Sequence, residues 1–186
     1  MKKGGLYMIE VRWHGRGGQG GFTAARLLGM AVAQYDEYYA QAFPSFGPER
    51  RGAPVLGFTR IDTKPIHDHS KVYTCDYVVV LDETLLDTVP VTDGLKEDGW
   101  ILINSQKNEQ EFSYLGARHI KTVDATGIAL DILGQPITNT AMFGALVAVS
   151  HIVSLDAALE SISLSMAPRL VSKNQSVVKK TYELLK

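Results

Sequence analysis

The glycine-rich run Gly15-Arg16-Gly17-Gly18-Gln19-Gly20 constrains the fold of this chain more than any other feature. The alternating segment 9–14 before it has the pattern of a β-strand, and residues 22–34 after it carry apolar side chains at helical spacing. Glycines permit the sharp reversal that joins a strand to a helix packed on it. The run therefore predicts a strand, a tight glycine turn and a helix, the opening unit of an α/β fold.

Further strands and helices are expected to alternate along the rest of the chain. The apolar run 77–81 is typical of a strand covered on both faces, and segments 100–104 and 119–123 resemble it. Strands are also predicted at 38–43 and 55–61, and helices at 125–133, 140–153, 156–163 and 168–185. We expect a Rossmann-like layered α/β fold, with a mostly parallel central sheet flanked by helices. The short link around Arg51 makes that sheet mixed.

Length and composition restrict the classes of protein that remain. The 186 residues suit a single domain over residues 1–186. Nineteen basic residues against twenty acidic ones argue against a nucleic-acid binder, and Gly134-Gln135-Pro136 interrupts the longest uncharged stretch, so no membrane span is expected. The single cysteine, Cys75, excludes an internal disulfide or an iron–sulfur cluster held by this chain alone, and a reducing cytoplasm fits best. The five histidines are scattered, and no metal site is predicted.

The glycine turn matches the pattern G-x-G-x-x-G of phosphate-binding turns. Backbone N–H groups and the positive end of the following helix can hold a phosphate there, and the Arg16 side chain can add donors. The alternative is a tight turn whose glycines serve only the backbone. The predicted strand 38–43 ends without the carboxylate that holds the ribose of NAD, so an ordinary NAD dehydrogenase is disfavoured.

The segment 42–54 joins rigid turn residues to two aromatic rings and the run Glu49-Arg50-Arg51. Adjacent arginines suit phosphate or carboxylate groups, and Glu49 can orient one of them. Two alternatives stay open: a solvated surface pair, or a subunit contact that includes Phe43 and Phe46.

Two polar positions follow or precede predicted elements. Asp82 comes directly after the strand 77–81, at the edge where open α/β sheets bind ligands, and it is also a good helix cap. Asn139 precedes an apolar helix and is most simply its N-cap. In the alternative, Asn139 or Thr140 lies near the glycine turn and takes part in the same site.

Three separated motifs together resemble one family. The Gly15–Gly20 turn, the Gln41–Pro54 segment and the run Thr138-Asn139-Thr140-Ala141-Met142 are similar to the gamma subunit of 2-oxoacid:ferredoxin oxidoreductases, and most like the pyruvate:ferredoxin type. The resemblance extends from about Met8 to Lys186. It implies one pyruvate/ketoisovalerate oxidoreductase gamma unit over residues 1–186.

The resemblance implies a non-catalytic subunit, inactive alone. Such complexes oxidise a 2-oxoacid with coenzyme A to acyl-CoA, carbon dioxide and reduced ferredoxin. Thiamine diphosphate, Mg²⁺ and [4Fe–4S] clusters are then expected in alpha, beta and delta partner subunits, with ferredoxin as acceptor. Relatives acting on indolepyruvate, 2-oxoglutarate or branched 2-oxoacids stay open, as does a free-standing nucleotide-binding oxidoreductase.

For this chain the resemblance, together with the glycine turn, implies contacts to coenzyme A. Its phosphates are expected at Gly15–Gly20 and at Glu49, Arg50 and Arg51, with Asn139 and Thr140 nearby. We also expect the lone chain to self-associate through aromatic residues near a subunit interface, namely Tyr38, Tyr39, Phe43 and Phe46.

Overall fold

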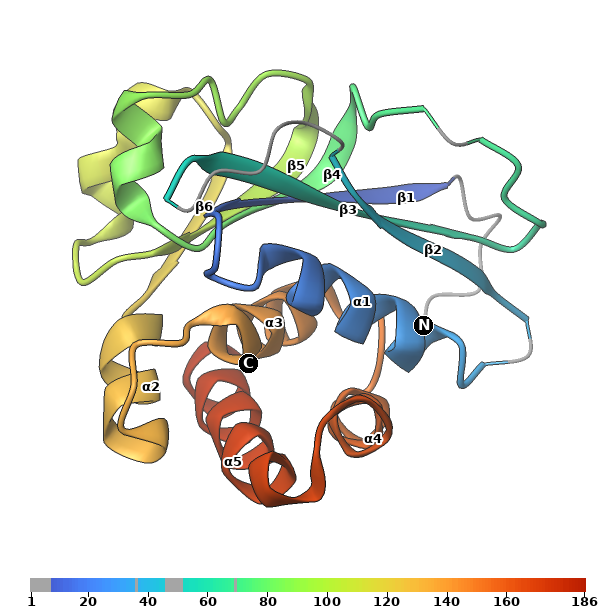
Figure 1. Ribbon diagram of the computed structural model, residues 1–186. Helices are drawn as coiled ribbons and strands as arrows, with labels where there is room; N and C mark the ends of the chain where they lie inside the picture. The colour runs from blue at the N-terminus through green and yellow to red at the C-terminus, as the bar shows by residue number, and fades with distance from the viewer. Residues whose placement is uncertain (1–7, 36, 46–51, 69) are drawn as a thin grey trace.

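A computed structural model describes residues 8–35, 37–45, 52–68 and 70–186. One six-stranded sheet organises the molecule, with the strand order β2-β3-β1-β4-β5-β6 (Figure 1). The strands are β1 (Ile9–Arg16), β2 (Tyr39–Pro44), β3 (Pro54–Asp62), β4 (Cys75–Val80), β5 (Leu95–Asn104) and β6 (His119–Val123).

The sheet is parallel on one side of β1 and antiparallel on the other. Strands β1, β4, β5 and β6 run parallel, whereas β3 pairs antiparallel with both β1 and β2. This arrangement confirms the predicted mixed α/β sheet. It also separates β2 from β1 by one strand, so the strand after the first helix does not neighbour β1 as it does in a doubly wound dinucleotide fold.

Figure 1 shows the α-helices gathered on one side of the sheet. They are α1 (Gly21–Val32), α2 (Ala125–Leu133), α3 (Asn139–Ser150), α4 (Leu155–Ser165) and α5 (Pro168–Leu185). Val11 and Trp13 of β1 and Val79 of β4 belong to the core cluster formed with these helices. Alternate residues of the same strands face the other side, where two short 3₁₀ helices, η1 (Glu83–Asp87) and η2 (Glu109–Leu115), help cover a second core.

Three local predictions need correction. Strand β1 continues through Gly15 and Arg16, which pair with Val55 and Pro54 of β3, so the turn proper begins at Gly17. Neither 3₁₀ helix is foreseen, because segments of five and seven residues are too short to show periodicity. Helix α3 begins at Asn139, whose N-cap is Thr138, so Asn139 is not the cap.

None of the helices in the described ranges combines the length and the apolar character that a membrane crossing needs.

Candidate functional site

The glycine turn between β1 and α1 has the conformation that requires glycine. Gly18 and Gly20 have φ angles of 97° and 79°, in the left-handed region that other residues rarely adopt. The Gly17 N–H donates to the Ala53 carbonyl at 2.9 Å, which fastens the turn to the start of β3. The Arg16 N–H donates to the Gln19 side-chain oxygen at 2.7 Å. These bonds hold the turn rigidly above the end of β1.

The N-terminus of α1 is left open by its sequence. Its N-cap is Gly20, which supplies no side-chain acceptor, and its first turn carries no acidic residue. The first amides of a helix have no partner within the helix, and they carry the positive end of its dipole. Within the described part of the chain, this end of α1 thus remains available to an anion.

Asn139 packs against this turn, as the alternative to capping predicts. A Cβ atom on Gly20 would overlap the Asn139 side-chain amide, so glycine permits the approach of α3 to α1. The Asn139 side-chain oxygen accepts from the Thr140 N–H at 2.8 Å. Asn139 is therefore the first residue of α3 rather than its N-cap, and its side chain packs against Gly20.

Thr140 is placed differently from Asn139. Its hydroxyl is fully buried and donates to the Asn174 side-chain oxygen of α5 at 2.9 Å. The Thr140 side chain therefore joins α3 to α5 and points away from the glycine turn. Glu49, Arg50 and Arg51, with Phe46, lie outside the described residues.

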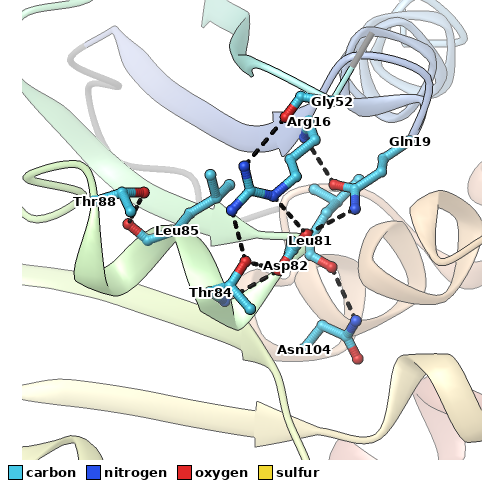
Figure 2. A network of polar contacts seen from close by, with 9 residues as sticks. All are labelled: Arg16, Gln19, Gly52, Leu81, Asp82, Thr84, Leu85, Thr88 and Asn104. Atoms are coloured by element: carbon cyan, nitrogen blue, oxygen red, sulfur yellow. Dashed lines mark hydrogen bonds and ion pairs between the residues drawn. The ribbon is translucent and has the colours of Figure 1, made fainter.

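Asp82 joins the glycine turn to the end of β4 (Figure 2). Its carboxylate accepts from Arg16 Nε at 3.0 Å and from Gln19 Nε2 at 2.9 Å. It also caps η1, as expected, by accepting from the Thr84 N–H at 3.0 Å. Arg16 donates in addition to the Thr84 hydroxyl at 2.7 Å and to the Gly52 carbonyl at 3.1 Å. The guanidinium is thus fixed in place by three partners.

The charge state of Asp82 follows from these contacts. Partial burial acts to raise the pKa of its carboxyl, but the hydrogen bonds from Thr84 and Gln19 and the Arg16 guanidinium outweigh it and lower the pKa below its ordinary value. Asp82 is therefore ionised at neutral pH and neutralises Arg16. An anion that approaches Arg16 meets a guanidinium already paired with a carboxylate.

A cavity of about 620 Å³ opens beside this network, at the carboxyl ends of β4, β5 and β6. Gln19 and Asp82 line it, together with Glu83, Lys107 and Asp124. Lys107 Nζ donates to Glu83 Oε1 at 2.6 Å. Three carboxylates thus face one lysine, so the cavity is acidic and suits hydroxyl or amide groups better than a phosphate.

Asn104 and Asp124 line this cavity, and neither is singled out by the sequence patterns. Asn104 Nδ2 donates to the Leu81 carbonyl and to the Thr126 hydroxyl, both at 2.9 Å, so it ties the ends of β4 and β5 to the start of α2. Asp124, at the end of β6, caps α2 by accepting from the Gly127 N–H at 2.7 Å. Asn104 directly follows an apolar strand run, which is the signal that singled out Asp82, whereas β6 before Asp124 contains His119 and Lys121.

Known proteins resemble this chain along almost its whole length. A family model described as pyruvate ferredoxin/flavodoxin oxidoreductase matches residues 10–184. Pyruvate synthase subunit PorC of Methanocaldococcus jannaschii is 50% identical over 180 residues, covering 96% of this chain and 98% of that protein. The pyruvate/ketoisovalerate oxidoreductases common subunit gamma of Thermococcus kodakarensis is 48% identical over 178 residues, covering 94% and 96%.

Solved structures agree with these relatives. Pyruvate oxidoreductase subunit PORC of Thermotoga maritima superposes with a TM-score of 0.83 at 39% identity, covering 96% of this chain and 97% of that one. A 2-oxoglutarate:ferredoxin oxidoreductase of Magnetococcus marinus shares the fold, with a TM-score of 0.73 at 15% identity, and this chain covers 31% of it. With a family model that spans nearly all of its residues and relatives about half identical in sequence, this chain belongs to the pyruvate ferredoxin/flavodoxin oxidoreductase family.

Proposed function

We propose that this chain is the gamma subunit of a complex that oxidises pyruvate, or a related 2-oxoacid, with coenzyme A to acyl-CoA, carbon dioxide and reduced ferredoxin. The observation that carries the proposal is the end-to-end match to proteins named as subunits of pyruvate synthase. Some relatives are named as a common subunit gamma of pyruvate and ketoisovalerate oxidoreductases. Because one gamma subunit then serves enzymes for two different 2-oxoacids, the choice of 2-oxoacid belongs to the partner subunits rather than to this chain.

The redox cofactors belong to the partners in this proposal. Thiamine diphosphate and Mg²⁺ are assigned to alpha and beta subunits, and the [4Fe–4S] clusters to beta and delta subunits. An iron–sulfur cluster needs several thiolates, and this chain has one cysteine. Cys75 is fully buried, and burial raises the pKa of its thiol to about 11, so it stays protonated at neutral pH.

The part of this chain in substrate binding is to hold phosphates of coenzyme A at the open end of α1. The capping-free first turn and the left-handed glycines leave backbone N–H groups accessible there. The Arg16 side chain is 28% exposed, and three of its five N–H groups donate within the described part of the chain. Two donors therefore remain for a phosphate oxygen. Arg50 and Arg51 are assigned to the same task from the sequence alone.

The subunit assignment is tested by anaerobic affinity purification of the tagged chain from its native host. We expect stoichiometric partner subunits, identified by mass spectrometry, with thiamine diphosphate and iron–sulfur clusters in the purified complex. The tagged chain recovered alone and turning over a nicotinamide cofactor would contradict the proposal.

Replacing Arg16 by methionine should raise the KM of the complex for coenzyme A about tenfold, the effect of losing one charged hydrogen bond. The KM for the 2-oxoacid should stay within about twofold, because that substrate is handled by other subunits. Initial rates with each substrate varied in turn provide the measurement. Arg118→Met is the matched control, since Arg118 precedes β6 at the opposite end of the sheet. Equal rises in both KM values would indicate an assembly defect instead.

The lone chain is also proposed to self-associate. Strand β2 is an edge of the sheet, and Tyr39 on it is 48% exposed. Unpaired edge strands with exposed aromatic side chains promote association. Light scattering that reports a monomer at high concentration would count against this.

A further inference from the structure

On the side of the sheet away from the α-helices, one buried arginine has no counter-ion among the described residues. Arg12 of β1 is 7% exposed. Its Nη2 donates to the carbonyl oxygens of Val91, at 2.9 Å, and of Asp93, and its Nε donates to His14 Nε2 at 3.0 Å. All three acceptors are uncharged. Within the described ranges, Arg12 forms no ion pair with a carboxylate.

A second buried arginine on the same face shows the usual arrangement. Arg60 of the neighbouring strand β3 is 1% exposed, and its Nε lies 2.8 Å from Glu10 Oε1. Its Nη2 lies 3.5 Å from Asp68 Oδ2. Buried charges are normally paired in this way, because an isolated ion in the interior carries a large desolvation penalty. Among the described residues Arg12 departs from that rule, so its guanidinium is open to pairing with an anion.

His14, beside Arg12, adds a neutral donor. Burial, and then the Arg12 charge, lower the pKa of His14 to about 3, so its ring is uncharged at neutral pH. Because Nε2 accepts from Arg12, the ring proton resides on Nδ1. Among the described residues neither this N–H nor Arg12 Nη1 has an acceptor, and neither nitrogen is fully enclosed by protein.

Both side chains line a cavity of about 470 Å³, which is separate from the acidic cavity at the carboxyl edge. Its walls are mostly apolar and include Leu56, Phe58, Leu85 and Val89. Lys71 and Asp93 also line it, and both are exposed. Arg12 and Lys71 against Asp93 give the lining a net charge of +1. This volume lies in the range of small-molecule sites, about 300–1,000 Å³.

We propose that this cavity binds a monocarboxylic acid with an apolar body, whose carboxylate accepts from Arg12 Nη1 and His14 Nδ1. One negative charge matches the net charge of the lining. The apolar walls bury the rest of the molecule favourably, whereas they would desolvate a phosphate dianion without enough compensating charge. The cavity should therefore bind such an acid more tightly than either a neutral molecule of the same shape or a phosphate.

The test uses the full chain and calorimetric titration with hexanoate, its neutral isostere hexanamide, and inorganic phosphate. We expect hexanoate to bind saturably below about 10 mM, and hexanamide at least about tenfold more weakly, because the amide loses a charge-assisted hydrogen bond. Phosphate should neither bind in the cavity nor displace hexanoate. Equal binding of hexanoate and hexanamide, or displacement by phosphate, would overturn the proposal.

Two variants test the residues. Arg12→Met should weaken hexanoate binding at least about tenfold. Leu56→Glu keeps Arg12 but places a carboxylate beside His14 from the neighbouring strand, since Leu56 pairs with His14, and it should abolish binding while the chain stays folded. Arg118→Met, an exposed arginine elsewhere, should bind as the unaltered chain does. Unchanged binding in Arg12→Met refutes the site. If hexanoate does not bind the folded chain and Arg12→Met prevents assembly of the complex, the anion that pairs with Arg12 comes from a partner subunit. That result would also refute the proposed site.

Discussion

Replacing Gly144 by valine should lower the free energy of unfolding by about 3 kcal/mol or prevent folding, which is near the upper end of overpacking effects. Gly144 lies in α3 where this helix packs on α5. A Cβ atom at this position would stand 2.9 Å from the Val178 carbonyl oxygen and 3.0 Å from its Cα. Both atoms belong to backbone, so the two helices must move apart to admit any side chain.

Gly144→Ala and Gly29→Ala form a matched pair for this test. Both remove a glycine from a helix interior, which by itself stabilises a helix by about 0.5–1 kcal/mol. At Gly29 of α1 the added Cβ would meet the Ala42 side chain at 3.5 Å, an ordinary contact. Urea unfolding should therefore find Gly29→Ala as stable as the unaltered chain or more stable, and Gly144→Ala less stable. Equal stability of the two variants would mean that α3 and α5 can move apart to admit a Cβ atom without loss of stability.

Acidification from pH 7 to pH 5 should cost this chain about 2 kcal/mol of stability through His14 alone. The native pKa of His14 is lowered from 6.5 to about 3 by burial and by Arg12. Below pH 6.5 the unfolded chain takes up a proton at this residue while the native chain does not. Stability is therefore highest above pH 6.5 and falls steadily as the pH approaches 3.

His14→Gln isolates this contribution. Glutamine can still accept a hydrogen bond from Arg12 but does not titrate, so the variant should lose about 2 kcal/mol less than the unaltered chain between pH 7 and pH 5. Urea unfolding at both pH values measures the difference. The pKa values of Asp82, Glu83 and Glu109 are also lowered, but the stability that these carboxylates contribute is lost mainly below pH 5, and equally in both proteins. Parallel losses in the two proteins would show that His14 is protonated in the native state.

Local patterns sufficed for most elements of the fold. The spacing of apolar residues and glycines predicts β1, the turn and α1 because these are contiguous in the sequence. The apolar runs within β4 and β5 are likewise readable, since a strand segment buried on both faces carries apolar residues in succession. Parallel strands place their carboxyl ends at one edge, so the position of Asp82 next to the turn also follows from sequence.

Contacts between distant segments decided the rest. The insertion of β3 between β1 and β2 depends on the pairing of β3 with β1, about 45 residues away in the sequence, which no local pattern reports. Asn139 looks like a cap until Gly20, far away in the chain, is placed against it. Likewise Glu10, Arg12 and His14 alternate with apolar residues, a pattern typical of a strand with one solvated face.

The sequence by itself thus determined the strand–turn–helix unit, the mixed α/β class and the family, because these depend on short-range patterns and on motifs in a fixed order. Only the tertiary structure decided that Arg12 and His14 are buried. The residues that cover them, such as Val91 and Leu85, come from segments some 70 residues further along the chain. Burial is a property of everything that packs around a side chain, so it becomes known only when the whole chain is in place.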